Sequence, residues 1–234
     1  MSGHKPITVV TGGNRGIGLE ICRQLASRGA QIVLTARSAE AGREAVKKLA
    51  ALKLPVQFHQ LDITQQDSVE ALRGFLDRSF GRLDVLVNNA GIFLKGETSG
   101  LEVSLNNVRE TLETNTLAPL RLSQVLAPLL KRSKTGRIVN ISSGMGQLSD
   151  MEGGYAAYRI SKTRLNAVTR ILAAELGGAV AVNAVCPGWV KTDMGGKNAE
   201  REVSQGAAGA VWLALDAPQE FTGRFTRDGK EISW

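Results

Sequence analysis

The stretch Thr11-Gly12-Gly13-Asn14-Arg15-Gly16-Ile17-Gly18 decides the fold. It follows the β-branched apolar run Ile7 to Thr11, which predicts a buried strand. It leads into Gly16 to Ser27, where apolar residues recur at helical spacing. Glycines between a strand and a helix let the backbone turn tightly and approach a pyrophosphate, which the N–H groups of the helix N-terminus then bind. The loop therefore predicts a dinucleotide-binding fold.

Short apolar runs and longer helical patterns alternate along the rest of the chain. The further expected strands are Gln31 to Ala36, Val56 to Leu61, Val85 to Asn88, Arg137 to Ile141, Val180 to Val185 and Phe221 to Thr226. The further expected helices are one capped by Ser38, then Thr64 to Phe80, Ser104 to Thr114, Thr116 to Lys131, Tyr155 to Leu176 and Val203 to Leu215. This alternation predicts an α/β fold: one domain over residues 1–234, with a doubly wound parallel sheet of Rossmann type and helices on both faces.

The composition excludes several classes of protein. The longest apolar run, Ala207 to Leu215, is far shorter than the roughly 18 residues that a membrane-spanning helix needs, so we expect no membrane partner. Cys22 and Cys186 cannot form a disulfide framework, which favours a reducing, cytoplasmic setting. With two lone cysteines, only His4 and His59 as histidines, and no His-Glu-x-x-His motif, we expect no catalytic zinc or other metal. A serine hydrolase would have to use His59, and the chain has no Gly-x-Ser-x-Gly elbow.

The charge balance favours anionic partners. The chain has 29 Lys and Arg against 22 Asp and Glu, a formal net charge of +7. Its densest basic stretch, Lys131 to Arg137, lies where a helical pattern ends and complements the negative end of that helix dipole. No aromatic residues interleave with these cations, so we expect no nucleic-acid partner. A phosphate-bearing cofactor is the expected anion instead.

The second expected strand indicates which cofactor. An NAD site usually has an acid about 20 residues after the glycine loop, at the end of this strand, to bind the ribose hydroxyls. Here the position holds Ala36, and Arg37 follows. Arg15 adds a second guanidinium within the glycine loop. A missing carboxylate together with two guanidiniums favours a ribose 2′-phosphate, and hence NADP(H).

Two tyrosines begin the long helix expected after residue 154. Tyr158 precedes Lys162 by four residues, so both side chains project from one helical face. A free phenol has a pKa near 10, and a nearby ammonium would stabilise its phenolate for proton exchange. Tyr155 has Arg159 at the same spacing, so spacing alone leaves both tyrosines as candidates.

Taken together, these motifs and their order make the chain resemble the short-chain dehydrogenase/reductase superfamily, from Ile7 to Trp234. Within it, Pro187 to Met194 and Leu34 to Arg37 are similar to the NADPH-dependent carbonyl reductases. The motifs that carry the resemblance are the glycine loop, Asn88-Asn89-Ala90-Gly91, Asn115, Ser142-Ser143, Tyr158 to Lys162 and Pro187-Gly188.

The resemblance implies roles for individual residues. Tyr158 would donate a proton to the substrate carbonyl, and Lys162 would lower the pKa of Tyr158 and hold the nicotinamide ribose. Ser143 would orient the carbonyl oxygen, with Ser142 as the open alternative, and Asn115 would hold a water that passes protons to Lys162. The residues expected to bind the cofactor are Gly12, Asn14, Arg15, Gly16, Ile17, Gly18, Arg37, Asp62, Ile63, Asn89, Gly91, Tyr158, Lys162, Pro187, Gly188, Val190 and Thr192.

The resemblance also implies an activity and an assembly. The expected activity is NADPH-dependent reduction of a ketone, aldehyde or quinone carbonyl. A 3-oxoacyl carrier-protein reductase or another alcohol dehydrogenase of the superfamily is an alternative. A non-catalytic dinucleotide sensor is the third, although no Tyr, Lys or Asn of the site is missing. Because the chain lacks the long insertion of some monomeric animal carbonyl reductases, a homodimer or homotetramer is expected.

Overall fold

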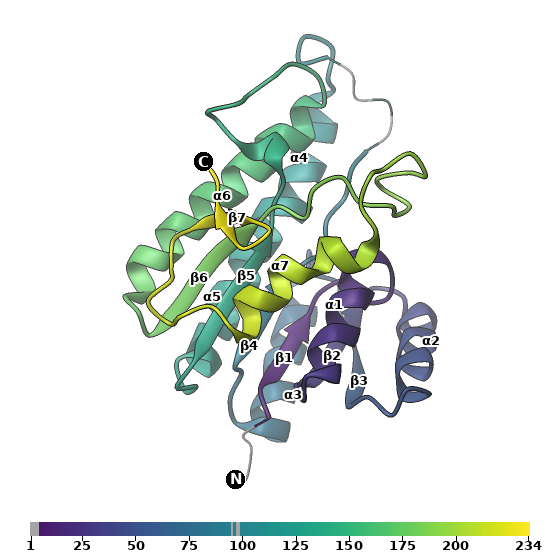
Figure 1. Ribbon diagram of the computed structural model, residues 1–234, viewed down its shortest axis with the longest axis vertical. Helices are drawn as coiled ribbons and strands as arrows, with labels where there is room; N and C mark the ends of the chain where they lie inside the picture. The colour runs from purple at the N-terminus through teal and green to yellow at the C-terminus, as the bar shows by residue number, and fades with distance from the viewer. Residues whose placement is uncertain (1–4, 95, 97–98) are drawn as a thin grey trace.

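The computed structural model describes residues 5–94, 96 and 99–234. Within these residues the strands form one sheet in the order β3-β2-β1-β4-β5-β6-β7-β8 (Figure 1). Neighbouring strands from β3 to β7 are parallel, and β8 runs antiparallel to β7. The chain starts in the middle of the sheet and winds outward to both edges, which confirms the predicted doubly wound, Rossmann-type sheet. The strands are β1 (Ile7–Val10), β2 (Gln31–Ala36), β3 (Val56–Gln60), β4 (Val85–Asn88), β5 (Gly136–Ile141), β6 (Val180–Val185), β7 (Phe225–Arg227) and β8 (Lys230–Glu231).

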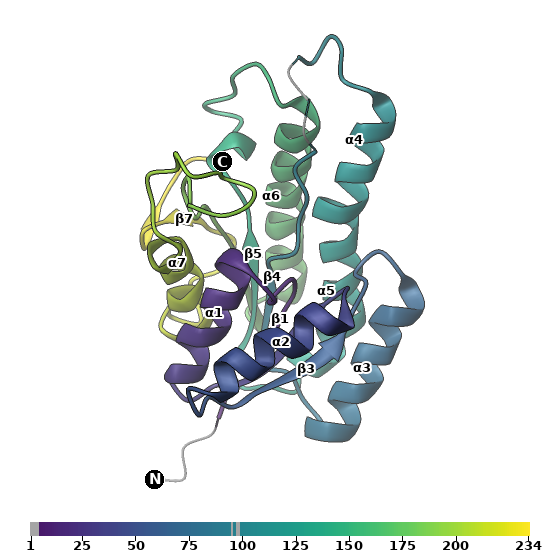
Figure 2. The ribbon, with the colours of Figure 1, turned by 90° about the vertical axis from the view of Figure 1, so that its right-hand side faces the viewer.

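Helices cover both faces of this sheet, as Figure 2 shows. α1, α2 and α7 pack on one face, whereas α3, α5 and α6 pack on the other. Successive strand residues supply the two cores: in β1, Val10 packs into one and Val9 into the other. Burial on both faces explains why the strands are continuous apolar runs. The helices are α1 (Gly16–Ser27), α2 (Ala39–Ala50), α3 (Gln66–Phe80), α4 (Leu105–Leu112), α5 (Ala118–Leu130), α6 (Ala156–Leu176) and α7 (Val203–Leu215).

Most predicted boundaries agree with the structure to within two residues. The expected N-cap of α2 is also confirmed, because Ser38 Oγ accepts a hydrogen bond from the backbone N–H of Ala41 at 3.2 Å. The two helices expected over 104–114 and 116–131 are not separate, however. A π-helical turn, η1 (Glu113–Leu117), joins α4 directly to α5. Such turns insert an extra residue into a helix and often occur at functional sites.

The C-terminal strand was predicted wrongly at its start. The segment from Phe221 lies beside β6, where the Gly223 N–H donates to the Val182 carbonyl oxygen at 2.8 Å, but Gly223 takes a φ of +69°, so it is not regular strand. The Phe221 ring packs against Trp212 of α7 with ring centres 5.3 Å apart. The strand β7 begins later and continues through a tight turn into β8, which the sequence analysis did not predict. Asp228-Gly229 at this turn has φ values of 52° and 74°, and such a pair is a hairpin signal.

His59 lies near the end of β3, as expected for a structural residue. Its ring lies 4.9 Å from that of Phe75 in α3, and burial lowers its pKa. His4 lies outside the described residues. A serine hydrolase mechanism through His59 has no support in this position.

Candidate active site

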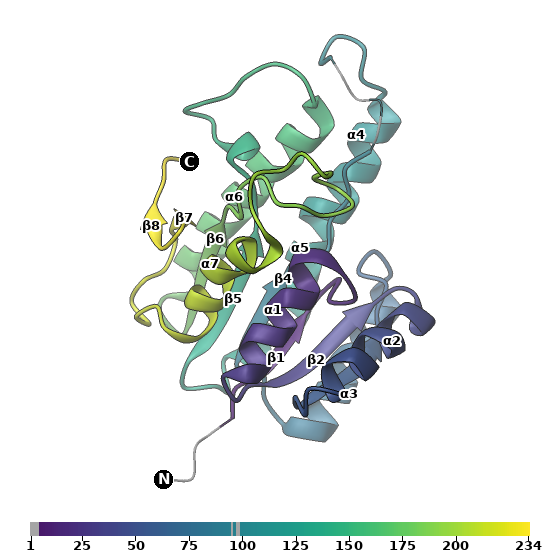
Figure 3. The ribbon, with the colours of Figure 1, turned by 45° about the vertical axis from the view of Figure 1, so that its right-hand side comes forward.

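The loops that follow the parallel strands surround a cavity of about 1360 Å³. They gather at the upper end of the sheet in Figure 3. In an open parallel sheet, ligands bind at the carboxyl ends of the strands where the strand order reverses, which here is between β1 and β4. All residues expected to bind the cofactor line this one cavity. Tertiary folding therefore brings together residues that are as far apart in the sequence as Gly12 and Thr192.

The glycine loop is held against the loop after β4. Asn89 Nδ2 donates to the carbonyl oxygens of Thr11 and Gly12 at 2.8 and 3.2 Å, and Thr11 Oγ1 accepts from the N–H of Asn89 at 2.9 Å. Gly12 takes a φ of +62°. A Cβ on Gly18 would lie only 2.4 Å from Asn89 Nδ2, so a side chain there is excluded. The close backbone approach is the cradle that a pyrophosphate needs.

Arg15 and Arg37 both line the cavity near the start of the first and second helices. β2 ends at Ala36 without a carboxylate, and no ion pair of Arg37 occurs in the described part of the chain. Arg15 Nη1, by contrast, contacts Asp193 Oδ2 at 2.8 Å, and both side chains are more than 70% exposed (73% and 76%). The donor set at this end of the cavity therefore fits a phosphate, with Asp193 as a competitor that sequence reasoning missed.

The cavity continues from this end toward β5 and α6. Asp62 follows β3, where its Oδ1 accepts from the Thr64 N–H at 3.0 Å and from Thr64 Oγ1 at 2.7 Å. Gly91 lies deeper, where a Cβ would be 3.1 Å from Asn115 Oδ1 and 3.7 Å from Lys162 Nζ. These positions link the glycine loop to the polar group on α6.

Tyr158 and Lys162 lie one turn apart on α6. Burial raises the pKa of Tyr158 to about 12, and the nearby Ser143 hydroxyl acts in the opposite direction. Lys162 Nζ donates to the carbonyl oxygen of Ile141 at 2.8 Å and lies 5.6 Å from the centre of the Tyr158 ring. Burial lowers the pKa of Lys162 to about 8. The lowering of the Tyr158 pKa by Lys162, which the resemblance implies, stays a prediction.

The two adjacent serines have different environments. Ser142 is buried, and its hydroxyl donates to Asn166 Oδ1 at 2.6 Å. Ser143 lines the cavity beside Tyr158, and its Oγ accepts from the Met145 N–H at 3.2 Å. This geometry favours Ser143 as the serine that faces a substrate.

Asn115 is buried within the π-helical turn η1, behind the cavity wall. Its Nδ2 donates to the Ile92 carbonyl oxygen at 2.9 Å and to Ser161 Oγ at 3.0 Å, and its Oδ1 accepts from the Ile92 N–H at 2.8 Å. The side chain thus anchors the loop after β4. The expected proton relay from Asn115 to Lys162 stays a prediction.

The structure separates the two candidate tyrosines. Tyr155 precedes α6 with a φ of 51° and is 45% exposed, whereas Tyr158 lies within the helix with Lys162 Nζ 5.6 Å from its ring centre. Phe93, which sequence reasoning missed, lies between them, with ring centres 5.2 Å from Tyr155 and 5.0 Å from Tyr158. No local pattern marks Phe93, because only folding of the β4 loop over α6 brings it there.

The described part of the chain has neither a cluster of metal ligands nor a membrane-spanning helix. Across residues 5–94, 96 and 99–234, no three His, Cys, Asp or Glu side chains gather closely enough to hold a metal ion. Over the same residues, no helix combines the length and apolar character needed to cross a membrane.

Comparison with known proteins agrees with this geometry. The profile described as short chain dehydrogenase matches residues 6–203. The chain is 34% identical to carbonyl reductase (NADPH) 1 of Mus musculus, covering 100% of both chains. It is 37% identical to (+)-neomenthol dehydrogenase of Arabidopsis thaliana, covering 91% of this chain and 92% of that one. The crystal structure of NADPH-bound carbonyl reductase from chicken fatty liver matches with a TM-score of 0.90 at 30% identity, covering 99% of this chain and 100% of that one.

The fold and site therefore define an oxidoreductase with a dinucleotide-binding sheet. The chain belongs to the short-chain dehydrogenase family, which confirms the resemblance found in the sequence. Within that family it is related to NADPH carbonyl reductases and to a neomenthol dehydrogenase.

Proposed function

We propose that this protein is an NADPH-dependent reductase that converts a ketone, aldehyde or quinone carbonyl to the alcohol. The observation that carries the proposal is that Tyr158, Ser143 and the buried Lys162 line the same cavity as Arg37 and the glycine loop, with Lys162 Nζ 5.6 Å from the centre of the Tyr158 ring. The carbonyl reductases to which the chain is similar support the same chemistry.

Each polar group has a distinct task in this proposal. NADPH, when bound, supplies the hydride. The Tyr158 hydroxyl donates its proton to the carbonyl oxygen, and Ser143 holds that oxygen by a hydrogen bond as negative charge develops on it. Tyr158 stays protonated at neutral pH because burial raises its pKa to about 12, which suits a proton donor.

Lys162 and Asn115 support proton transfer at Tyr158. Lys162 has three N–H donors and uses one on the Ile141 carbonyl, so the others remain for a ribose. Its positive charge would stabilise the phenolate that Tyr158 becomes when it gives its proton to the carbonyl oxygen. A water at Asn115 and the ribose would then return a proton to Tyr158. NADP(H) rather than NAD(H) follows from Arg37 and Arg15, with no carboxylate at the end of β2.

The experiment is a screen of carbonyl compounds that follows NADPH loss by absorbance. Aliphatic ketones, aromatic aldehydes and quinones would be compared with NADPH and with NADH. We expect turnover of at least one class, faster with NADPH. NADPH binding without turnover of any carbonyl compound, or of any alcohol with NADP⁺, would favour the non-catalytic sensor instead.

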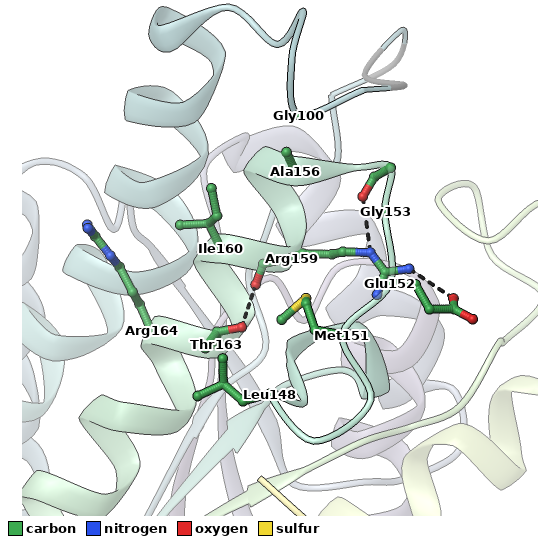
Figure 4. A pocket seen from close by; sticks show the side chains of 11 residues that line it. Gly100, Leu148, Met151, Glu152, Gly153, Ala156, Arg159, Ile160, Thr163 and Arg164 are labelled. Carbon is green, nitrogen blue, oxygen red and sulfur yellow. Dashed lines mark hydrogen bonds and ion pairs between the residues drawn. The ribbon is translucent and has the colours of Figure 1, made fainter.

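We also propose a homodimer or homotetramer. The outer side of α6 has a pocket of about 430 Å³ between this helix and the segment before it (Figure 4). Its walls include the exposed apolar side chains of Leu148, Met151 and Ile160. The alignment with the mouse enzyme spans 282 residues, more than the 234 of this chain, so that enzyme has segments with no counterpart here. Light scattering that finds only monomer at micromolar concentration would contradict this assembly.

A cytoplasmic setting and a single domain over 1–234 complete the proposal. Cys22 and Cys186 are both free and buried, as expected in a reducing compartment. The continuous sheet and the two cores on its faces support one folding unit.

A further inference from the structure

Arg227 places a guanidinium beside the reacting centre. It ends β7 and lines the large cavity. Its Nη2 lies 2.5 Å from the position that a Cβ on Gly144 would take. Gly144 directly follows Ser143, and adjacent Cα atoms are only about 3.8 Å apart. The guanidinium therefore fills the space of a missing side chain next to the serine that faces the substrate.

The hydrogen bonds of Arg227 in the described part of the chain go to a sulfur atom and not to a carboxylate. Its Nε and Nη2 donate to Cys186 Sγ at 3.3 and 3.1 Å, and a cysteine sulfur is a weak acceptor. That sulfur already accepts from the N–H groups of Gly144 at 3.1 Å and Gly188 at 3.4 Å. The residue opposite Arg227 in the hairpin is another cation, Lys230.

Four other cations on the same cavity have a carboxylate partner: Arg15, Arg159, Lys191 and Arg201, whereas Arg37 and Lys162 have none in the described part of the chain. Arg201 pairs with Asp228 through two hydrogen bonds, so the acid next to Arg227 in the chain directs both carboxylate oxygens to Arg201 and acts on Arg227 only as a nearby charge. Arg159 pairs with Glu152 at 3.2 Å, and Lys191 pairs with Glu202. No ion pair of Arg227 is found in the described part of the chain. Arg227 thus differs from these neighbours and resembles Arg37 at the cofactor end.

We propose that Arg227 binds a carboxylate of the substrate, so that the preferred substrates are oxo acids. This inference rests on the proposed carbonyl reduction and names its substrate class. Because Arg227 lies beside the residue after Ser143, the carboxylate must lie close to the reacting carbonyl, as in 2-oxo and 3-oxo acids. Two N–H groups on one edge of the guanidinium can donate to the two oxygens of a carboxylate. A bound carboxylate would therefore replace the Cys186 sulfur, a weak acceptor, as the hydrogen-bond partner of Arg227.

The test compares acids with their neutral esters. Pyruvate and ethyl pyruvate, and acetoacetate and ethyl acetoacetate, would be assayed with NADPH for the unmodified protein, Arg227→Gln and Arg227→Lys. We expect the unmodified protein to prefer an acid over its ester. Arg227→Gln should raise KM for that acid roughly tenfold to hundredfold and leave the ester unchanged. Arg227→Lys should recover part of the preference, because charge remains while the planar fork is lost. Pyruvate with its ester tests 2-oxo acids and acetoacetate with its ester tests 3-oxo acids, so the pair that shows the preference for the acid identifies the substrate class.

Arg224→Gln is the matched control. It removes the same charge from the segment leading into β7, but Arg224 lies outside the cavity lining and pairs with Glu231 at 3.2 Å. It should leave the acid preference intact. Equal KM values for acid and ester in the unmodified protein, or equal effects of Arg227→Gln on both, would overturn the inference.

Calorimetry separates this inference from the proposed reaction. Lactate and 3-hydroxybutyrate, the product-like hydroxy acids, would be titrated into the protein saturated with NADP⁺. We expect heat of binding that Arg227→Gln abolishes, while NADP⁺ affinity stays unchanged. This measurement needs no turnover, so binding without reduction would reject only the proposed function. Binding of neither acid would overturn the role of Arg227, even if neutral carbonyl compounds are reduced.

Discussion

Removing the guanidinium of Arg37 should weaken NADPH binding and leave NADH binding nearly unchanged. The two cofactors differ only in the 2′-phosphate, and Arg37 follows the end of β2, where that group is expected. Arg37→Gln keeps a polar side chain and removes only the charge. The variant therefore isolates the phosphate contact from the rest of the glycine loop.

The structure sets the relative size of the effect at the two arginines. A charge-assisted hydrogen bond contributes about 1.5–3 kcal/mol, and solvent exposure of Arg37 argues for the lower end, about a tenfold loss of affinity. Arg15 must first give up Asp193, and an exposed ion pair of this kind contributes about 0.2–1 kcal/mol. Arg15→Gln should therefore weaken NADPH by less, roughly twofold to eightfold. Asp193→Asn should strengthen it by up to about fivefold.

Fluorescence titration of each variant with NADPH and NADH measures the two dissociation constants. The order of NADPH affinity should be Asp193→Asn, unmodified protein, Arg15→Gln, Arg37→Gln, from tightest to weakest. Equal losses for NADPH and NADH in Arg37→Gln would show that this residue does not bind the 2′-phosphate. A weaker affinity for NADPH in Asp193→Asn would show that the ion pair supports the site rather than competing with it.

Three further predictions follow from the site. Tyr158→Phe should abolish turnover and leave NADPH affinity near normal, whereas Tyr155→Phe should keep most of kcat and mainly shift KM. Steady-state kinetics measure both variants, and an active Tyr158→Phe with an inactive Tyr155→Phe would refute the assignment. Gly18→Ala should lose most NADPH affinity and about 1–3 kcal/mol of stability, because its Cβ would lie 2.4 Å from Asn89 Nδ2 and from the Gly12 carbonyl oxygen. Gly153→Ala, with nothing within 4 Å, is its control in thermal unfolding. Burial lowers the pKa of Lys162 from 10.5 to about 8. Between about pH 8 and pH 10.5, Lys162 therefore binds more protons in the unfolded chain than in the folded protein. Because of this difference, the contribution of Lys162 to the free energy of unfolding rises with pH over this range. Melting curves should show that Lys162→Met removes this rise, and an unchanged pH dependence would contradict it.

Short-range patterns were sufficient for the fold and for the location of the site. The glycine loop, the apolar strands and the N-cap at Ser38 each depend on a few consecutive residues, and the structure confirms them. The alternation of strands and helices then leaves few topologies, because crossovers between parallel strands are right-handed. Apart from Tyr158 and Lys162 on α6, the predicted cofactor-binding residues lie in the segments that follow strands, so the sheet brings them to one edge.

Adjacent or equally spaced residues could not be told apart by sequence. Ser142 and Ser143 differ only because Asn166 of α6 takes up the hydroxyl of Ser142. Tyr155 and Tyr158 have similar neighbours along the helix, yet Tyr155 is 45% exposed and only Tyr158 has its ring beside Lys162 Nζ. These distinctions depend on how α6 packs against the end of β5.

The tertiary structure determines which charged side chains of the cavity pair with each other and how burial shifts pKa values there. Asp193 meets Arg15 across 178 positions of sequence, and Arg227 meets Cys186 across 41. The raised pKa of Tyr158 and the lowered pKa of Lys162 likewise come from burial, which the spacing of the two residues does not reveal. The sequence by itself determined the sheet, the dinucleotide loop and the set of polar residues at its edge. Which of those residues touch, and which cations remain without a carboxylate, depends on contacts between distant segments that form only when the chain is folded.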